Sequence, residues 1–88
     1  MGQNIKTVLI TGAAGGVGRA TVAYFDQCGF QVIGVDRLPC FDGFPQNGLY
    51  VQSDISVPEN LELIYERARQ FTPTLDVLVN NAAFQVTK

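Results

Sequence analysis

A glycine-rich turn near the start of the chain separates an apolar segment from a helical pattern. Residues 8–11 are Val-Leu-Ile-Thr, and Gly12, Gly15, Gly16 and Gly18 follow before the apolar residues take up helical spacing. A strand that ends in glycines and leads into a helix directs backbone N–H groups and the positive end of the helix dipole at one point. Glycines leave space there for a bulky anion. The pattern predicts a phosphate-binding turn, and a glycine-rich turn without a ligand is the alternative.

The spacing of these glycines suggests a separate task for each. Gly12, Gly16 and Gly18 form G-x-x-x-G-x-G, which differs from the strict dinucleotide pattern G-x-G-x-x-G. We expect Gly12 to allow a tight exit from the strand and Gly18 to let the helix pack closely on the sheet. Gly15 and Gly16, with Val17 beside them, are expected to contact a pyrophosphate. No Lys-Ser or Lys-Thr pair follows the glycines, which excludes a P-loop.

Strand and helix patterns alternate through the rest of the chain, and the strand segments are almost wholly apolar. Such strands are typical of a parallel sheet covered on both faces. The sequence therefore predicts an α/β fold: a doubly wound, Rossmann-like parallel sheet with strand order 3-2-1-4 and a ligand crevice at the carboxyl ends of its strands. Prolines and glycines make residues 37–48 an irregular connection. The predicted strands are residues 5–10, 31–35, 49–53 and 75–79; one predicted helix spans residues 16–28, and a second follows residues 56–59 and ends near residue 71.

Local signals mark the ends and faces of both helices. Gly29 stands where a left-handed residue would end the first helix. Ser56 and Glu59 form a capping-box pattern at the start of the second helix, with Pro58 in its first turn. The expected apolar face of the first helix is Val17, Ala20, Tyr24 and Cys28, broadened by Val22 and Phe25, and that of the second helix is Leu61, Ile64, Ala68 and Phe71.

A glycine or a polar residue follows the carboxyl end of each predicted strand: Gly12, Asp36, Asp54 and Asn81. A carboxylate at position 36 could accept hydrogen bonds from both hydroxyls of an adenosine ribose. It would repel a 2′-phosphate and so favours NAD over NADP, whereas a solvated Asp that caps a turn is the alternative. Arg37 could stack on adenine, could neutralise Asp36 and tolerate NADP, or could lie on the surface.

The other two strand ends carry Asp54-Ile55 and Asn81-Ala82-Ala83. Asp54 could bind the adenine amino group while Ile55 packs on the ring, although an Asp just before a helix also suits a structural role near the cap. The Asn81 side chain is expected to bridge the strand end and a cofactor ribose. Ala82 and Ala83 would allow close approach, and a simple Asn turn is the alternative.

Composition narrows the classes of function. The 88 residues make one small domain, and a net charge of −2 argues against non-specific binding to nucleic acid. No apolar run approaches the roughly 18 residues of a membrane span, so we expect no membrane partner. Cys28 and Cys40 are too few for a structural zinc site in a chain without histidine, and we expect no metal. Free thiols are typical of a reducing cytoplasm.

Four motifs together resemble the N-terminal half of the short-chain dehydrogenase/reductases: Thr11-Gly12-x-x-x-Gly16-x-Gly18, Asp36, Asp54-Ile55 and Asn80-Asn81-Ala82. The resemblance covers about residues 5–83. It implies a Rossmann-like fold and an NAD(P)-dependent oxidoreductase acting on alcohols and ketones, whose matching segments bind NAD, with NADP also possible. Ala83 stands where this family usually has Gly. Gly12, Gly15 and Gly18 also fit the glycine pattern of the extended, epimerase-type branch.

The family's catalytic Ser and Tyr-x-x-x-Lys are expected beyond residue 88, so we assign no catalytic residue. Tyr65 begins only a Tyr-x-x-x-Arg and is expected to pack on the second helix; Tyr24 and Tyr50 fit core or sheet positions. We expect residues 1–88 to form a single, truncated NAD(P)-binding domain that is catalytically incomplete. A small alcohol or ketone would be the substrate of a full-length parent protein. A homo-oligomer is possible. The alternatives are a non-catalytic nucleotide-binding or sensing module and a fragment of an epimerase-like member.

Overall fold

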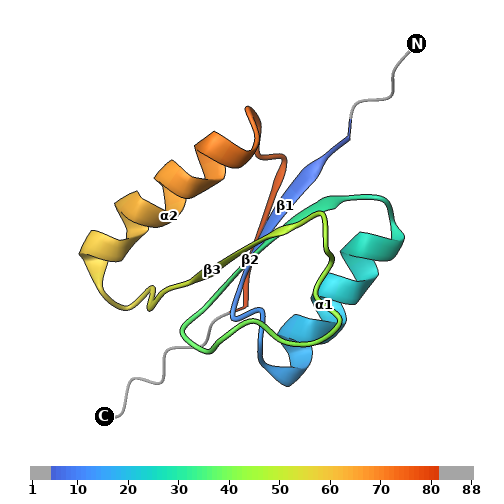
Figure 1. Ribbon diagram of the computed structural model, residues 1–88, viewed down its shortest axis with the longest axis horizontal. Helices are drawn as coiled ribbons and strands as arrows, with labels where there is room; N and C mark the ends of the chain where they lie inside the picture. The colour runs from blue at the N-terminus through green and yellow to red at the C-terminus, as the bar shows by residue number, and fades with distance from the viewer. Residues whose placement is uncertain (1–4, 82–88) are drawn as a thin grey trace.

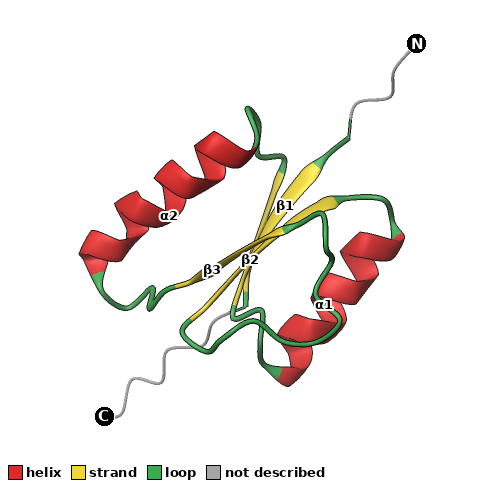
Figure 2. Cartoon of the chain, viewed as in Figure 1, coloured by secondary structure: helices red, strands yellow, loops and turns green. Residues whose placement is uncertain are grey.

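The computed structural model describes residues 5–81, which form a four-stranded parallel sheet with one helix on each face (Figures 1 and 2). The strands are ordered β3-β2-β1-β4, which confirms the predicted order and fold class. The register aligns Leu9 of the central strand with Ile33 on one side and Leu78 on the other. The elements are β1 (Thr7–Thr11), α1 (Gly16–Gln27), β2 (Gln31–Asp36), β3 (Leu49–Gln52), α2 (Pro58–Phe71) and β4 (Val77–Asn80).

The sheet separates two hydrophobic cores, one under each helix. Every residue of β1 is buried, because helices cover both of its faces. Successive side chains of a strand point to opposite faces, so alternate residues of β1 and β2 enter different cores. The core under α2 contains Leu9, Ile33, Val35, Val51, Ile64 and Ala68, and the core under α1 contains Val8, Ile10, Ala13, Val22 and Val32.

The face of α1 that meets the sheet differs from the predicted one. A Cβ atom at Gly18 would overlap the carbonyl oxygen of Gly12, so the helix backbone touches the glycine turn at this point. Val22 is buried and Phe25 is half-buried on the same side of the helix. A hydrophobic pattern gives no weight to a glycine, yet this glycine fixes which side faces the sheet. The predicted stripe was wrong, since Val17, Ala20, Tyr24 and Cys28 are all exposed.

The end of α1 follows the sequence closely. Gly29 has a φ of +87°, which confirms the left-handed residue predicted there. Its N–H donates to the carbonyl of Asp26, and the N–H of Phe30 donates to the carbonyl of Phe25, both at 3.0 Å. This pair of bonds is a Schellman motif, and the rings of Phe25 and Phe30 pack edge to face at 4.9 Å between centroids.

The connection from β2 to β3 contains no helix in residues 37–48, as predicted. Phe41 and Phe44 of this segment pack with Tyr50 of β3 against the core under α1. The fit is close, because a Cβ at Gly34 would lie 2.7 Å from the Phe44 ring and one at Gly48 would lie 2.6 Å from the carbonyl oxygen of Val32. Aromatic side chains therefore cover this part of the sheet where a helix would otherwise stand.

The start of α2 corrects the predicted capping box. The N-cap residue is Val57, which makes no side-chain cap hydrogen bond, while Pro58 occupies the first turn as expected. The Ser56 hydroxyl instead donates to the Asp54 carboxylate at 2.7 Å. A nearby charged acceptor makes the stronger bond, so the hydroxyl does not turn toward the helix.

The predicted apolar face of α2 is correct at three of its residues. Ile64 and Ala68 are buried against the sheet, and Phe71 packs at the margin of the same core. Leu61 was expected to be buried with them, but it is 41% exposed. It borders a small apolar cavity between α2 and β4 instead of reaching the core.

The first and last strands along the chain, β1 and β4, begin later in the sequence than predicted. Strand β1 begins at Thr7 rather than at residue 5, and β4 begins at Val77 rather than at residue 75. Asp76 holds this corner, because its carboxylate accepts the Thr7 N–H at 2.8 Å and its own N–H donates to the Thr7 carbonyl at 2.9 Å. A side chain that bonds the backbone in this way marks the entry to a strand rather than its interior.

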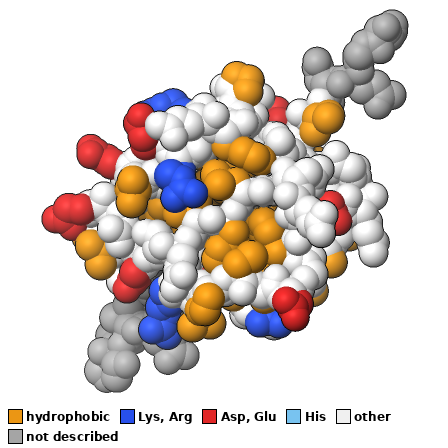
Figure 3. All heavy atoms as spheres, in the orientation of Figure 1, with side chains coloured by type: hydrophobic (Ala, Val, Ile, Leu, Met, Phe, Trp, Pro, Cys, Tyr) orange, Lys and Arg blue, Asp and Glu red, His pale blue; other side chains and the backbone are white. Residues whose placement is uncertain are grey.

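The surface carries dispersed charge. On the face drawn in Figure 3, the Lys and Arg side chains lie apart from one another rather than in one patch. Cys28 and Cys40 are free, as expected, and both are exposed. Within residues 5–81 no helix has both the length and the apolar character that crossing a bilayer requires. In the same range no cluster of His, Cys, Asp or Glu could hold a metal ion.

Candidate functional site

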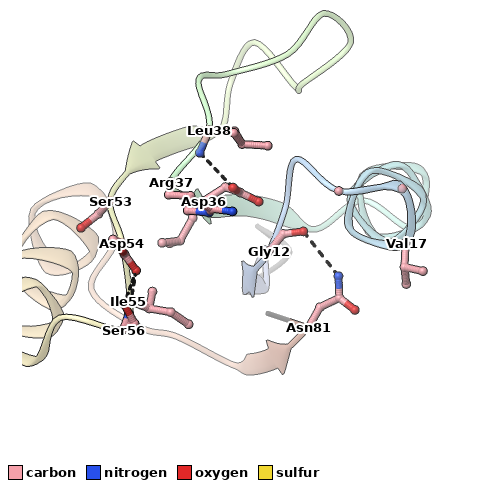
Figure 4. A pocket seen from close by; sticks show the side chains of 13 residues that line it. Gly12, Val17, Asp36, Arg37, Leu38, Ser53, Asp54, Ile55, Ser56 and Asn81 are labelled. Atoms are coloured by element: carbon pink, nitrogen blue, oxygen red, sulfur yellow. Dashed lines mark hydrogen bonds between the residues drawn. The ribbon is translucent and has the colours of Figure 1, made fainter. Parts of the chain in front are cut away.

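An open cavity of about 710 Å³ lies at the carboxyl ends of the strands (Figure 4). The glycine turn and the start of α1 form one side, and the turn between β3 and α2 forms the opposite side. In open α/β sheets this edge is where ligands bind, next to the point where the strand order reverses. The lining residues are Gly12, Gly15, Gly16, Val17, Val35, Asp36, Arg37, Leu38, Ser53, Asp54, Ile55, Ser56 and Asn81.

The glycine turn places the start of α1 at this cavity. Gly12 has a φ of +68°, a conformation that favours glycine and lets the chain turn sharply out of β1. Gly15 is the N-cap of α1, and among the described residues it has no side-chain cap and the first turn has no acidic residue. The first N–H groups of a helix lack intrahelical partners. Those of Gly16, Val17 and Gly18 therefore form a positive end suited to an anion.

Gly16 has space beside it that the rest of the described chain does not fill. A Cβ built at this position meets no described atom within 4 Å, in contrast to the overlap at Gly18. Internal packing therefore requires a glycine at position 18 but not at position 16. An extended group from outside the chain could approach the backbone at Gly16, which is the task expected of this residue.

Asp36 joins the end of β2 to the glycine turn. One carboxylate oxygen accepts the N–H of Ala14 at 2.9 Å, and the other accepts the N–H of Leu38 at 2.9 Å. The residue is half-buried and lines the cavity. Each carboxylate oxygen has more than one acceptor site, so these two bonds leave capacity for further donors. Both oxygens are thus held in place while still able to accept hydroxyl hydrogens from a ligand.

Thr11 links the end of β1 to the end of β4. Its hydroxyl donates to the side-chain oxygen of Asn80 at 3.0 Å and accepts the N–H of Asn81 at 3.0 Å. The Asn81 side-chain amide also points toward the glycine turn and donates to the Gly12 carbonyl at 3.4 Å (Figure 4). The side chain of Asn81 therefore orders the first residue of the turn from across the sheet.

The turn after β3 is held by hydrogen bonds between its own residues. Asp54 accepts both the N–H of Ser56 at 2.9 Å and its hydroxyl at 2.7 Å. These two bonds stabilise the charged form and hold the pKa of the Asp54 carboxyl below its usual value, with Arg37 adding a smaller attraction. Ile55 lines the cavity and also packs at the margin of the core under α2. Asp54 therefore has the structural role near the helix start that was its alternative. Its second carboxylate oxygen accepts none of the hydrogen bonds described within this turn.

Comparison with known proteins places the chain in a family. The short chain dehydrogenase family profile matches residues 6–88. The chain belongs to the short chain dehydrogenase family. Among individual relatives, it is 36% identical over 77 residues to an uncharacterized oxidoreductase of Schizosaccharomyces pombe, a match that covers 88% of this chain and 30% of the relative.

Solved structures of other proteins share the fold described above. An oxidoreductase of this family from Brucella ovis, in complex with a partially ordered NAD, aligns with a TM-score of 0.75 and 31% identity over 90% of this chain and 39% of its own. ElxO with NADP bound aligns with a TM-score of 0.81 and 27% identity over 97% of this chain and 38% of its own. The chain thus spans about a third of the length of such relatives.

The segments that carry the short chain dehydrogenase resemblance meet at one cavity. Of the predicted site residues, Gly18 lies beneath the cavity rather than in its lining, in the packing position expected of it. Ala82 and Ala83 lie outside the described residues. The remaining predicted residues all line the cavity, namely Gly12, Gly15, Gly16, Val17, Asp36, Arg37, Asp54, Ile55 and Asn81.

The sequence pattern missed four lining residues: Val35, Leu38, Ser53 and Ser56. Each lies within two positions of Asp36 or Asp54 in the sequence. Closeness in sequence to a predicted carboxylate was therefore the signal that could have identified them. Leu38 is 48% exposed and lines the cavity just beyond Asp36.

The tyrosines lie outside the lining of this cavity. Tyr65 borders the small apolar cavity between α2 and β4 and is 46% exposed. The core or sheet position expected for Tyr24 was wrong, since it is 62% exposed on α1. Tyr50 lies in β3 as expected, half-buried against the aromatic residues of the connection between β2 and β3.

Proposed function

We propose that this chain binds the adenosine diphosphate part of NAD(P) in the cavity at the carboxyl ends of its strands. The observation that supports this most strongly is the joint placement of the uncapped start of α1 and the Asp36 carboxylate on one cavity. The first suits a diphosphate and the second suits a ribose. Solved structures with NAD or NADP bound share this fold at 27–31% identity, and the NAD complex is of a short chain dehydrogenase/reductase family member.

The residues present fit such a group. The cavity volume of about 710 Å³ lies within the usual range for ligand sites. The N–H groups of Gly16 and Val17 would hold the diphosphate, and the open space at Gly16 would admit it. Asp36 would accept hydrogen bonds from the adenosine ribose, and its charge would disfavour a 2′-phosphate, so NAD is the preferred cofactor.

Ligand recognition would extend to the other lining residues. We propose that Ile55 packs on the adenine ring and that the free oxygen of Asp54 accepts a hydrogen bond from the adenine amino group. Arg37 is exposed and lines the same side, where it could stack on the base. Asn81, followed by Ala82 and Ala83, would approach the cofactor ribose beyond the diphosphate.

For the whole protein we propose hydride transfer between the nicotinamide cofactor and a small alcohol or ketone, in the cytoplasm. The cofactor supplies the hydride chemistry, and residues 1–88 would serve as one nucleotide-binding domain that orients it. We place no catalytic residue in this domain. Tyr65 precedes Arg69 rather than a Lys, and arginine cannot release its proton as a catalytic partner would need to.

Titration calorimetry with NAD and NADP tests the proposal. We expect saturable binding of both, with NAD bound more tightly. Asp36→Ala removes the ribose acceptor and the repulsion of a 2′-phosphate, so NAD affinity should fall by roughly tenfold, equivalent to about 1.4 kcal/mol, and the preference for NAD should narrow. Asp26→Ala removes a carboxylate of the same charge from an exposed position on α1 and should change neither affinity. Equal affinities for NAD and NADP in the unmodified protein would remove the role given to Asp36.

A further inference from the structure

Tyr50 contacts the backbone next to Asp36 without lining the cavity itself. Its hydroxyl donates to the carbonyl oxygen of Leu38 at 2.7 Å and lies 3.3 Å from that of Pro39. The N–H of the same Leu38 donates to Asp36 at 2.9 Å. A single residue of backbone therefore connects the tyrosine hydroxyl to one oxygen of the cavity carboxylate.

Arg19 makes the corresponding connection to the other oxygen. Its Nε–H donates to the carbonyl of Ala14 at 2.9 Å, and the N–H of Ala14 donates to the second oxygen of Asp36 at 2.9 Å. The guanidinium group also lies over the ring of Phe41, 4.7 Å from its centroid. Phe41 and Tyr50 are in edge-to-face contact at 6.2 Å between centroids, so the contacts form a closed ring that includes Asp36.

We propose that Tyr50 and Arg19 are positioning residues, which fix the Asp36 carboxylate for the ribose through Leu38 and Ala14. This inference rests on the proposed function. Preorganised acceptors bind more tightly because less conformational freedom is lost on binding. A helix after Asp36 would hold the neighbouring backbone rigid, but the connection from β2 to β3 contains no helix. The ring of contacts through Tyr50 and Arg19 holds this backbone in place instead.

The charges around Tyr50 agree with its role as a donor. Burial and the negative charge of Asp36 raise the pKa of Tyr50 to about 12, with a smaller contribution from Cys40 and an opposing one from Arg19. The hydroxyl is protonated at neutral pH, as that of an ordinary tyrosine is, and the raised pKa keeps it so to higher pH. It can therefore donate to the Leu38 carbonyl under the conditions in which the cofactor would bind.

Tyr50→Phe tests this role because it removes the hydroxyl and keeps the ring packed against Phe41 and Phe44. ADP-ribose, which carries the adenosine and diphosphate of NAD, is the probe in titration calorimetry. We expect its affinity to fall by roughly fivefold, as for loss of one hydrogen bond. Tyr65→Phe removes an equivalent hydroxyl from α2 and should leave the affinity unchanged.

A double-mutant cycle with Asp36→Asn separates positioning from a general effect on the fold. If Tyr50 acts through the carboxylate, Tyr50→Phe should have little further effect on affinity in the Asp36→Asn protein. The same loss in both backgrounds would overturn the inference, because it would show that Tyr50 does not act through Asp36. Hydrogen exchange at the Leu38 amide should also become faster in Tyr50→Phe, because Tyr50 acts through Leu38.

Arg19→Lys gives an independent test, since it keeps the charge but loses the planar donor and the stacking on Phe41. Its ADP-ribose affinity should fall as in Tyr50→Phe, whereas Arg67→Lys on the exposed side of α2 should bind normally. Unchanged affinity in both Tyr50→Phe and Arg19→Lys overturns this inference alone. If the unmodified protein fails to bind ADP-ribose, the proposed function and this inference are both overturned.

Discussion

The two sides of the cavity are held in different ways. On one side, Ala14 bonds to Asp36 and Asn81 bonds to Thr11, contacts that join residues 22 and 70 positions apart in the sequence. On the other side, Asp54 and Ser56 bond only two positions apart, in a largely exposed turn. The first side is built from long-range contacts between strand ends, whereas Asp54 and Ser56 of the second side are held by bonds within their own turn.

This difference indicates which side should limit the binding of a ligand. Long-range contacts require the sheet to be assembled, so the glycine turn and Asp36 take their positions only in the folded protein. A local turn can form and rearrange with little effect on the rest of the chain. Substitutions that break the long-range contacts of the first side should therefore lower stability and affinity together, whereas those in the second should change affinity or pKa with little effect on stability.

Gly18→Ala should have the largest effect. The added Cβ would overlap the Gly12 carbonyl, so α1 would have to move away from the glycine turn. We expect the free energy of unfolding to fall by about 3 kcal/mol, measured by urea denaturation. A loss within experimental error would show that the contact between α1 and the turn does not fix the first side of the cavity.

Gly16→Ala is the matched control two residues earlier on the same helix. Its Cβ meets no described atom, and alanine is the better helix former, so stability should rise by about 0.5 kcal/mol. NAD affinity should nevertheless fall by roughly tenfold, about 1.4 kcal/mol, because the methyl group enters the space proposed for the diphosphate. The two alanine substitutions thus separate internal packing from ligand contact.

Ser56→Ala should have the smallest effect on stability. The melting temperature should change by roughly 2 °C or less, because the residue lies in an exposed turn. The pKa of Asp54 should rise toward its ordinary value, since the hydroxyl that stabilises its charged form is removed. An NMR titration of the Asp54 carboxyl measures this directly.

The pH dependence of this effect has a definite sign. A depressed pKa in the folded state contributes stability above the ordinary carboxyl pKa, and that contribution is lost as the pH falls through the folded value. The difference in stability between Ser56→Ala and the unmodified protein should therefore shrink in acid. A difference that grows in acid would mean that Ser56 does not act through the charge of Asp54.

The sequence predicted the sheet and the meeting of four strand ends at one cavity, because both depend on order along the chain. Apolar strands that alternate with helices indicate a parallel sheet, and the carboxyl ends of its strands lie at one edge. Gly12, Asp36, Asp54 and Asn81 could therefore be placed together before any coordinates were known. The left-handed Gly29 was predictable for a similar reason, since its effect is local.

Features that depend on three-dimensional contact were not predicted. The close approach of Gly18 was expected, but the face of α1 that it sets was not, because glycine has no side chain to enter a hydrophobic pattern. The capping box failed because Asp54 competes for the Ser56 hydroxyl. The bond from Ala14 to Asp36 could not be foreseen, because nothing in the sequence of the glycine turn indicates which of its N–H groups faces the end of β2.

The most direct test of the central claim is an NMR titration of the ¹⁵N-labelled protein with ADP. We expect saturable shifts that are largest at the amides of Gly16, Val17 and Gly18, followed by those of Leu38 and Ala14 beside Asp36. This pattern would place the diphosphate at the start of α1 and the ribose at the end of β2. Shifts that do not saturate, or that map to α2 and β4 instead, would contradict the account.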